Sequence, residues 1–187
     1  MHPRHRHSGG KAALVLAGLL MGCPYVGPPT PLPYDGGPLE RDPACTLTGA
    51  LQVTLGEGDG SDFTPLTPGQ APVIHHGPQG GTHVSLGVRV DNPATQFPGL
   101  RLDFFGEFQG ECEAWSDCEA YEVYARYTTV VRLAEYFLPQ EGGAVAVSGV
   151  ILQGPWPMPG KRRIRVDVLD RCGRTGSTVV ELSPPTP

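Results

Sequence analysis

The clearest metal-binding chemistry in this sequence lies in three closely spaced histidines. His75, His76 and His83 flank residues 77–81, a Gly- and Pro-containing stretch that is typical of a turn. If the flanking residues pair as a β-hairpin, His75 lies directly opposite His83, with their Cβ atoms about 4.5–5.5 Å apart. Two imidazoles at that distance could bind copper or zinc. His76 would point to the other face of the hairpin, so no third ligand is evident.

The alternative for the same histidines is a pair of half-exposed polar strand residues. Structural zinc sites use four protein ligands and catalytic zinc sites use three plus water. We therefore predict no metal at this hairpin, and His75 and His83 are the candidate ligands if a metal does bind.

A second possible cation site is the acidic segment 107–122, which contains six carboxylate side chains. Carboxylates on a loop are ligands that Ca²⁺ prefers. The spacing of an EF-hand is absent, and we expect this segment to form a solvated acidic face.

No sequence motif indicates catalysis. A Gly-x-Ser-x-Gly elbow, a His-Glu-x-x-His helix and a Gly-rich phosphate loop are all missing from the sequence. Trp115 and Trp156 lie in loop-like sequence, where they could bind carbohydrate or peptide or could simply pack over the domain. We expect no enzymatic activity and no cofactor.

The charge balance argues against nucleic acid as a partner. The formal net charge of the 187 residues is −5. The only basic cluster, Lys161, Arg162, Arg163 and Arg165, is too short for the extended Lys- and Arg-rich surface that phosphate backbones require. We expect it to lie on a solvated turn and strand face.

The first 22 residues have the organisation of an export signal. Arg4, Arg6 and Lys11 precede a small and apolar run over residues 12–20, and the first acidic residue is Asp35. This order is typical of a secretory signal peptide. The run is about half of the roughly 20 residues that a membrane-spanning helix needs.

The motif Leu20-Met21-Gly22-Cys23 resembles the lipobox of bacterial lipoproteins. The resemblance covers residues 1–23. It implies cleavage after Gly22 and a lipid on Cys23, and so an exported protein anchored to the bacterial membrane, at the outer membrane or cell surface. The alternative is an ordinary signal peptide that happens to contain a cysteine.

Four further cysteines suggest two disulfides in an exported chain: Cys45, Cys112, Cys118 and Cys172. Three pairings are possible. We favour a local Cys112–Cys118 bridge, because a short loop closes easily, and hence Cys45–Cys172 between the two ends of the domain. A zinc thiolate site is the alternative, but Cys-x2-Cys spacing is absent.

Two segments flank the predicted domain. Residues 23–43 contain seven prolines and have almost no apolar periodicity. Such a segment favours extended polyproline conformations and is predicted to be a tether between membrane and domain. Residues 184–187 are predicted to form a disordered tail.

Residues 44–183 are predicted to form the folded domain, because apolar and polar residues alternate in several short runs. The clearest runs are 47–55, 84–90, 121–133 and 164–168, and Gly- and Pro-containing turns separate them. Alternation places one row of side chains in a core and the other in water. Seven to nine such strands predict an all-β antiparallel sandwich.

The last two strands resemble the closing hairpin of bacterial immunoglobulin-like surface domains. The resemblance lies in residues 165–182, where a strand ends at Asp170, a Gly-containing turn follows, and a Val-rich strand closes the sheet. It implies an immunoglobulin-like fold and carries no activity, and the Cys–Trp–Cys core pattern is missing. We expect a lipid-anchored binding or structural module with an unidentified protein or carbohydrate ligand, the alternative being a copper- or zinc-binding lipoprotein.

Overall fold

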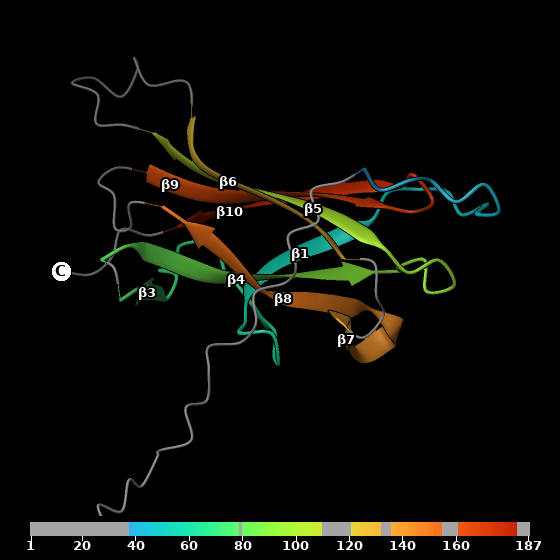
Figure 1. Cartoon of the computed structure of the whole chain (residues 1–187), viewed down its shortest axis with the longest axis horizontal. Helices are drawn as coiled ribbons and strands as arrows, with labels where there is room; N and C mark the ends of the chain where they lie inside the picture. Colours follow the sequence, from blue (N-terminus) through green and yellow to red (C-terminus); the bar gives the residue numbers. More distant parts are fainter. Residues whose placement is uncertain (1–37, 79, 110–120, 132–135, 155–160, 183–187) are drawn as a thin grey trace, which may run out of the picture.

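The computed structural model describes residues 38–78, 80–109, 121–131, 136–154 and 161–182, and these form two antiparallel β-sheets (Figure 1). One sheet contains β1 (Gln52–Glu57), β2 (Thr64–Pro65), β3 (Ile74–His76), β4 (Thr82–Asp91), β7 (Leu138–Pro139) and β8 (Val145–Gln153). The other contains β5 (Leu100–Gln109), β6 (Glu122–Val131), β9 (Lys161–Asp170) and β10 (Thr175–Leu182). A short 3₁₀ turn, η2 (Glu141–Gly143), joins β7 to β8.

The strand order is that of an immunoglobulin-like sandwich. The larger sheet runs β2-β1-β4-β8-β7, with β3 paired to β4, and the smaller sheet runs β10-β9-β5-β6. The strands β1, β4, β8 and β7 thus correspond to the A-B-E-D order of that fold, and β10, β9, β5 and β6 to G-F-C-C′. The all-β sandwich predicted from the alternating runs is confirmed. The described part of the chain has ten strands, and two of them, β2 and β7, have only two residues each.

The core lies between the two sheets, as the alternation requires. Alternate residues of β4 and β9 are fully buried, including Val84, Leu86, Ile164 and Val166. The strand β5 buries Leu100, Leu102 and Phe104, and its charged residues Arg101 and Asp103 alternate with them and are partly exposed. The prediction of burial is wrong for two residues of the apolar rows. Leu47, which precedes β1, is 47% exposed, and Val123 on β6 is 53% exposed.

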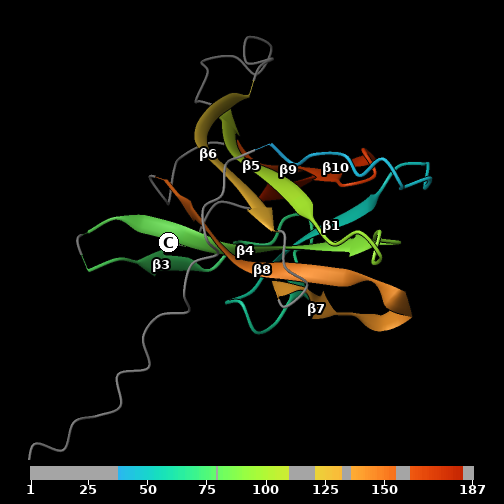
Figure 2. The same cartoon turned by 45° about the vertical axis from the view of Figure 1, so that its right-hand side comes forward.

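The connecting segments gather at two opposite ends of the sandwich. At one end lie residues 38–50, the loop 92–99, η2 and the turn between β9 and β10, on the right of Figure 1. The β3–β4 hairpin extends from the other end, as the turned view also shows (Figure 2). The chain therefore reaches the described domain at the end that carries the loop 92–99.

Candidate functional site

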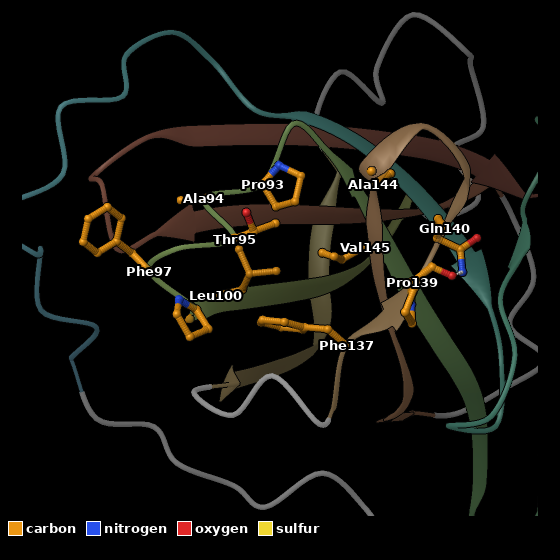
Figure 3. Close-up of a pocket in the computed structure, with 13 residues that line it drawn as sticks. Pro93, Ala94, Thr95, Phe97, Leu100, Phe137, Pro139, Gln140, Ala144 and Val145 are labelled. Atoms are coloured by element: carbon orange, nitrogen blue, oxygen red, sulfur yellow. Dashed lines mark hydrogen bonds between the residues drawn. The ribbon is translucent and has the colours of Figure 1, made fainter.

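A cavity of about 340 Å³ opens between two loops at the end of the sandwich where the described chain begins. We call it the loop pocket. One wall is formed by residues 93–100, which join β4 to β5, and the other by residues of β7, η2 and the start of β8, as Figure 3 shows. Its volume lies at the lower end of the range of about 300–1,000 Å³ that is common for ligand sites.

The lining of the loop pocket is apolar and uncharged. It consists of Pro93, Ala94, Thr95, Phe97, Pro98, Gly99, Leu100, Phe137, Pro139, Gln140, Gly143, Ala144 and Val145. Not one of these side chains is ionisable. The Thr95 hydroxyl and the Gln140 amide are the polar side-chain groups, and Gln140 Nε2 donates a hydrogen bond to the Pro139 carbonyl at 3.2 Å. The arrangement can hold an apolar group and supplies no acid, base or charged nucleophile.

The disulfide predicted between Cys45 and Cys172 is present and supports the wall of the loop pocket. The two Cα atoms lie 5.2 Å apart, within the usual range for a disulfide. Cys45 and Cys172 are both buried in a small cluster with Ala94, and Phe97 packs against it. Because Ala94 and Phe97 also line the loop pocket, the same apolar cluster connects the disulfide to the wall formed by residues 93–100.

A buried ion pair holds the same loop from the side of the β9–β10 turn. Asp170 and Arg174 are 2% and 7% exposed, and Arg174 Nε donates to Asp170 Oδ2 at 2.8 Å. Asp170 Oδ1 also accepts the backbone N–H groups of Cys172 and Arg174. Arg174 Nη2 donates to the carbonyl oxygen of Asn92 at 3.0 Å, where the loop begins. The loop 92–99 is therefore held at Asn92 by a hydrogen bond from the Arg174 guanidinium, and at Ala94 and Phe97 by apolar packing on the disulfide.

The histidine hairpin forms with the predicted register. His75 pairs with His83 across β3 and β4, and their rings stack with centroids 5.3 Å apart. Gly80 supplies a positive φ of 83° in the turn, a conformation that glycine adopts readily. Burial, and then the nearby His75, lower the pKa of His83 below its ordinary value of 6.5.

No third metal ligand joins these histidines in the described residues. Within the ranges that the structure covers, no three His, Cys, Asp or Glu side chains are placed to hold a metal ion. His76 pairs with Thr82 at the next position of the ladder and is not part of the stacked pair. The hairpin thus offers two imidazole side chains, fewer than the three or four protein ligands of zinc sites.

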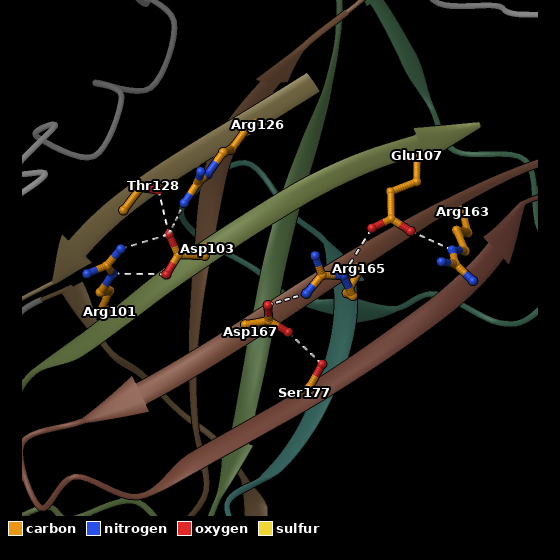
Figure 4. Close-up of polar contacts among 9 residues, drawn as sticks. All are labelled: Arg101, Asp103, Glu107, Arg126, Thr128, Arg163, Arg165, Asp167 and Ser177. Atoms are coloured by element: carbon orange, nitrogen blue, oxygen red, sulfur yellow. Dashed lines mark hydrogen bonds and ion pairs between the residues drawn. The ribbon is translucent and has the colours of Figure 1, made fainter. Parts of the chain in front are cut away.

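The outer face of the four-stranded sheet carries a ladder of ion pairs, drawn in Figure 4. Glu107 accepts hydrogen bonds from Arg163 at 2.5 Å and from Arg165 at 3.0 Å. The Arg165 guanidinium also stacks 3.9 Å from the centroid of the Phe105 ring. Because two arginines hold this carboxylate, the ladder joins β5 to β9 across the surface of the sheet.

Asp103 occupies a similar position in the ladder. It accepts hydrogen bonds from Arg101 Nε at 2.9 Å and from Thr128 Oγ1 at 2.5 Å. Burial alone would raise the pKa of Asp103, but these hydrogen bonds and the charges of Arg101 and Arg126 outweigh it, so its pKa is lowered. This carboxylate is therefore held ionised, which does not suit a general acid.

Several predicted features lie outside the described residues. These are the lipobox cysteine Cys23, the pair Cys112 and Cys118, most of the acidic segment 107–122, and both tryptophans, Trp115 and Trp156. Of the acidic segment, Glu107 is engaged in the arginine ladder and Glu122 is exposed at the start of β6. Among the residues that are described, no helix is long and apolar enough to cross a membrane.

The loop pocket itself was not predicted from the sequence. Its two walls are about 40 positions apart, and each is a short loop containing proline and phenylalanine. The available signal was the clustering of Pro93, Phe97 and Pro98 in one loop and of Phe137 and Pro139 in the other.

The chain matches no protein-family model, and a comparison with curated proteins finds no match.

Proposed function

We propose that this chain is a lipid-anchored protein of the cell envelope whose β-sandwich is a non-catalytic binding module. The observation that supports the binding role is the loop pocket, a concave and uncharged site on a loop that a disulfide and a buried ion pair brace. A braced loop loses little conformational freedom when a ligand binds, and this favours affinity.

The chemistry of the lining favours binding over catalysis. General acid–base catalysis needs a titratable group within hydrogen-bond reach of the reacting atoms. The pocket lining contains none, and the Thr95 hydroxyl has no imidazole, amine or carboxylate among the lining residues to activate it.

The ligand class that fits best is an extended protein segment with an aromatic or proline side chain. Proline and phenylalanine rings line both walls, and grooves lined by aromatic rings bind proline-rich peptides. A carbohydrate presents many hydroxyl groups, each of which needs a polar partner when it is buried. Thr95 and Gln140 supply few such partners, so a protein segment is favoured over a sugar.

The anchor is proposed from Leu20-Met21-Gly22-Cys23 and its preceding apolar run. A lipid on Cys23 would connect the membrane to the domain through residues 24–37. The described chain begins beside the loop pocket, so the pocket would lie at the tethered end of the domain.

A peptide selection tests the binding role. Random peptides displayed on phage are selected on the immobilised mature chain, and the enriched peptides are then tested on two variants. Thr95 is exposed and lines the cavity, so Thr95→Trp should fill it; Gln96 is its exposed neighbour outside the lining, so Gln96→Trp is the matched control. We expect enriched peptides with aromatic or proline residues whose binding is lost in Thr95→Trp only. Failure to enrich any peptide, or equal binding to both variants, would contradict the proposal.

The stacked pair His75 and His83 supports copper or zinc binding as a second candidate function. Calorimetric titration of the mature chain with each metal separates the two candidates. Micromolar affinity that His83→Ala abolishes would favour metal handling, whereas we expect only weak binding from two imidazoles.

A further inference from the structure

We propose that the chain's own proline-rich segment, residues 24–37, docks in the loop pocket and places the Tyr34 ring in the cavity. The segment would then compete with any external ligand for the pocket. This inference rests on the proposed function only in treating the loop pocket as a binding site.

The described chain begins against the outer side of the pocket wall. Pro38 and Glu40 line a surface depression together with Pro98 and Arg171, and Pro98 also lines the loop pocket. Leu39 is buried and packs beside Gly99, the next residue of the same wall. Pro38, the first described residue, therefore lies beside the loop whose other side faces the cavity.

The position of this N-terminal segment is fixed by polar contacts as well. The Asp42 backbone N–H donates to the carbonyl oxygen of Arg171 at 2.7 Å, and Arg171 Nη2 pairs with Asp42 Oδ2 at 3.3 Å. Three residues further along, Cys45 is covalently joined to Cys172. Because these contacts hold residues 39–45 to the domain, residues 24–37 would join the domain at the end that carries the loop pocket.

The composition of the undescribed segment matches the pocket. The sequence from Pro31 to Tyr34 is Pro-Leu-Pro-Tyr, which combines an aromatic ring with an aliphatic side chain and carries no charge. Prolines favour an extended polyproline conformation that loses little entropy on binding. An aromatic ring with a polar hydroxyl also suits a cavity that is apolar inside and has Gln140 and Thr95 in its lining.

The connection is long enough to permit docking. Tyr34 precedes Pro38 by four positions, and four extended residues span up to about 14 Å. A ligand held on such a short linker has an effective concentration on the order of 1 mM. A segment with an intrinsic dissociation constant of about 0.1 mM would then fill the pocket in about nine molecules out of ten, and an external peptide would bind about tenfold more weakly.

Photo-crosslinking in the full mature chain tests where position 34 lies. The photoreactive residue p-benzoylphenylalanine replaces Tyr34, and mass spectrometry of the crosslinked peptides locates its partners. We expect crosslinks within one chain to residues 93–100 and 137–145. They should be lost when Thr95→Trp is added and retained with Gln96→Trp. The same label at Val73, which is 57% exposed beside β3, should give no crosslink to the pocket.

Crosslinks spread over the surface, crosslinks that join two chains, or crosslinks that Thr95→Trp leaves unchanged would each overturn the inference. A synthetic peptide of residues 24–37 gives an independent measurement. We expect it to bind the Tyr34→Ala chain about tenfold more tightly than the wild-type chain, because the internal competitor has been removed.

The peptide measurement also separates this inference from the proposed function. Equal affinity for the wild-type and Tyr34→Ala chains would overturn internal docking, while sensitivity of that binding to Thr95→Trp would still support the pocket as a binding site. Absence of peptide binding to either chain would overturn the inference as well. Internal crosslinks together with a failed phage selection would support docking and contradict the external-ligand role.

Discussion

Cys45 and Cys172 are separated by 127 positions, yet a disulfide joins them with their Cα atoms 5.2 Å apart. The bond connects the segment before β1 to the turn between β9 and β10. Ala94 and Phe97 pack on it and also line the loop pocket. One covalent bond thus ties the first and last parts of the domain to the pocket wall.

Removing this disulfide is expected to destabilise the domain strongly. In the chain-entropy model, a loop of this length contributes about 4–5 kcal/mol to the free energy of unfolding. The double variant Cys45→Ser/Cys172→Ser should lose about that much in urea unfolding. Cys112→Ser/Cys118→Ser should lose less, because that predicted bridge would close a short loop. Equal losses for both pairs would contradict this assignment of the main stabilising bridge.

Arg174 is expected to matter for stability because its partner is buried. Arg174→Gln would leave the Asp170 carboxylate, which is 2% exposed, without its guanidinium. Breaking a buried ion pair in this way costs about 3–5 kcal/mol. The control is Arg89→Gln, because Arg89 forms a half-exposed pair with Asp91, and its loss should cost about 0–1 kcal/mol. Chemical denaturation of both variants measures the difference, and similar values would count against the role of the buried pair.

The stacked histidines predict a loss of stability in mild acid. The pKa of His83 is lowered in the folded state by burial and by His75, so the unfolded chain takes up that proton first as the pH falls below about 6.5. The contribution of neutral His83 to the free energy of unfolding is fully present above pH 6.5, and it is lost as the pH falls through the lowered pKa of His83.

Melting temperatures of the wild type and of His83→Gln between pH 7.5 and 5 measure this effect. The wild type should lose more stability over that window than His83→Gln does. His76→Gln is the matched control, because His76 lies outside the stacked pair, and it should follow the wild type. Identical slopes for wild type and His83→Gln would show that the pair does not sense pH.

The lipid anchor gives a prediction that is independent of the fold. Lipidated Cys23 should place the mature protein in the membrane fraction and add acyl mass to its N-terminal peptide, because two or three acyl chains hold a protein stably in a bilayer. Cys23→Ser should be released or left unprocessed. An N-terminal peptide of wild-type protein with no acyl mass would refute the anchor.

The alternating residues predicted the sandwich because burial on one face of a strand leaves a period of two in the sequence. The same rule failed for Val123 and Leu47. Val123 lies next to an irregularity in the pairing of β5 with β6, at Gly106 and Glu107, and Leu47 precedes the first strand. A bulge shifts the faces of a strand without a clear mark in the alternation.

The histidine pair could be predicted because both residues belong to one hairpin, whose turn fixes the register. The loop pocket could not, because its walls come from the β4–β5 and β7–β8 connections. Their approach depends on how the sheets pack and on the contacts of Cys172 and Arg174 with the loop. Such long-range contacts leave no periodic signal in either segment.

The affinity of a selected peptide for the loop pocket, measured by calorimetry at several temperatures, tests the central claim most directly. Burial of an apolar side chain gives a negative heat-capacity change on binding. We predict such a change for the wild type and for Gln96→Trp, and a dissociation constant at least about tenfold higher for Thr95→Trp, equivalent to about 1.4 kcal/mol. Equal dissociation constants for the two tryptophan variants, with no heat-capacity change, would contradict the assignment of the loop pocket as the binding site.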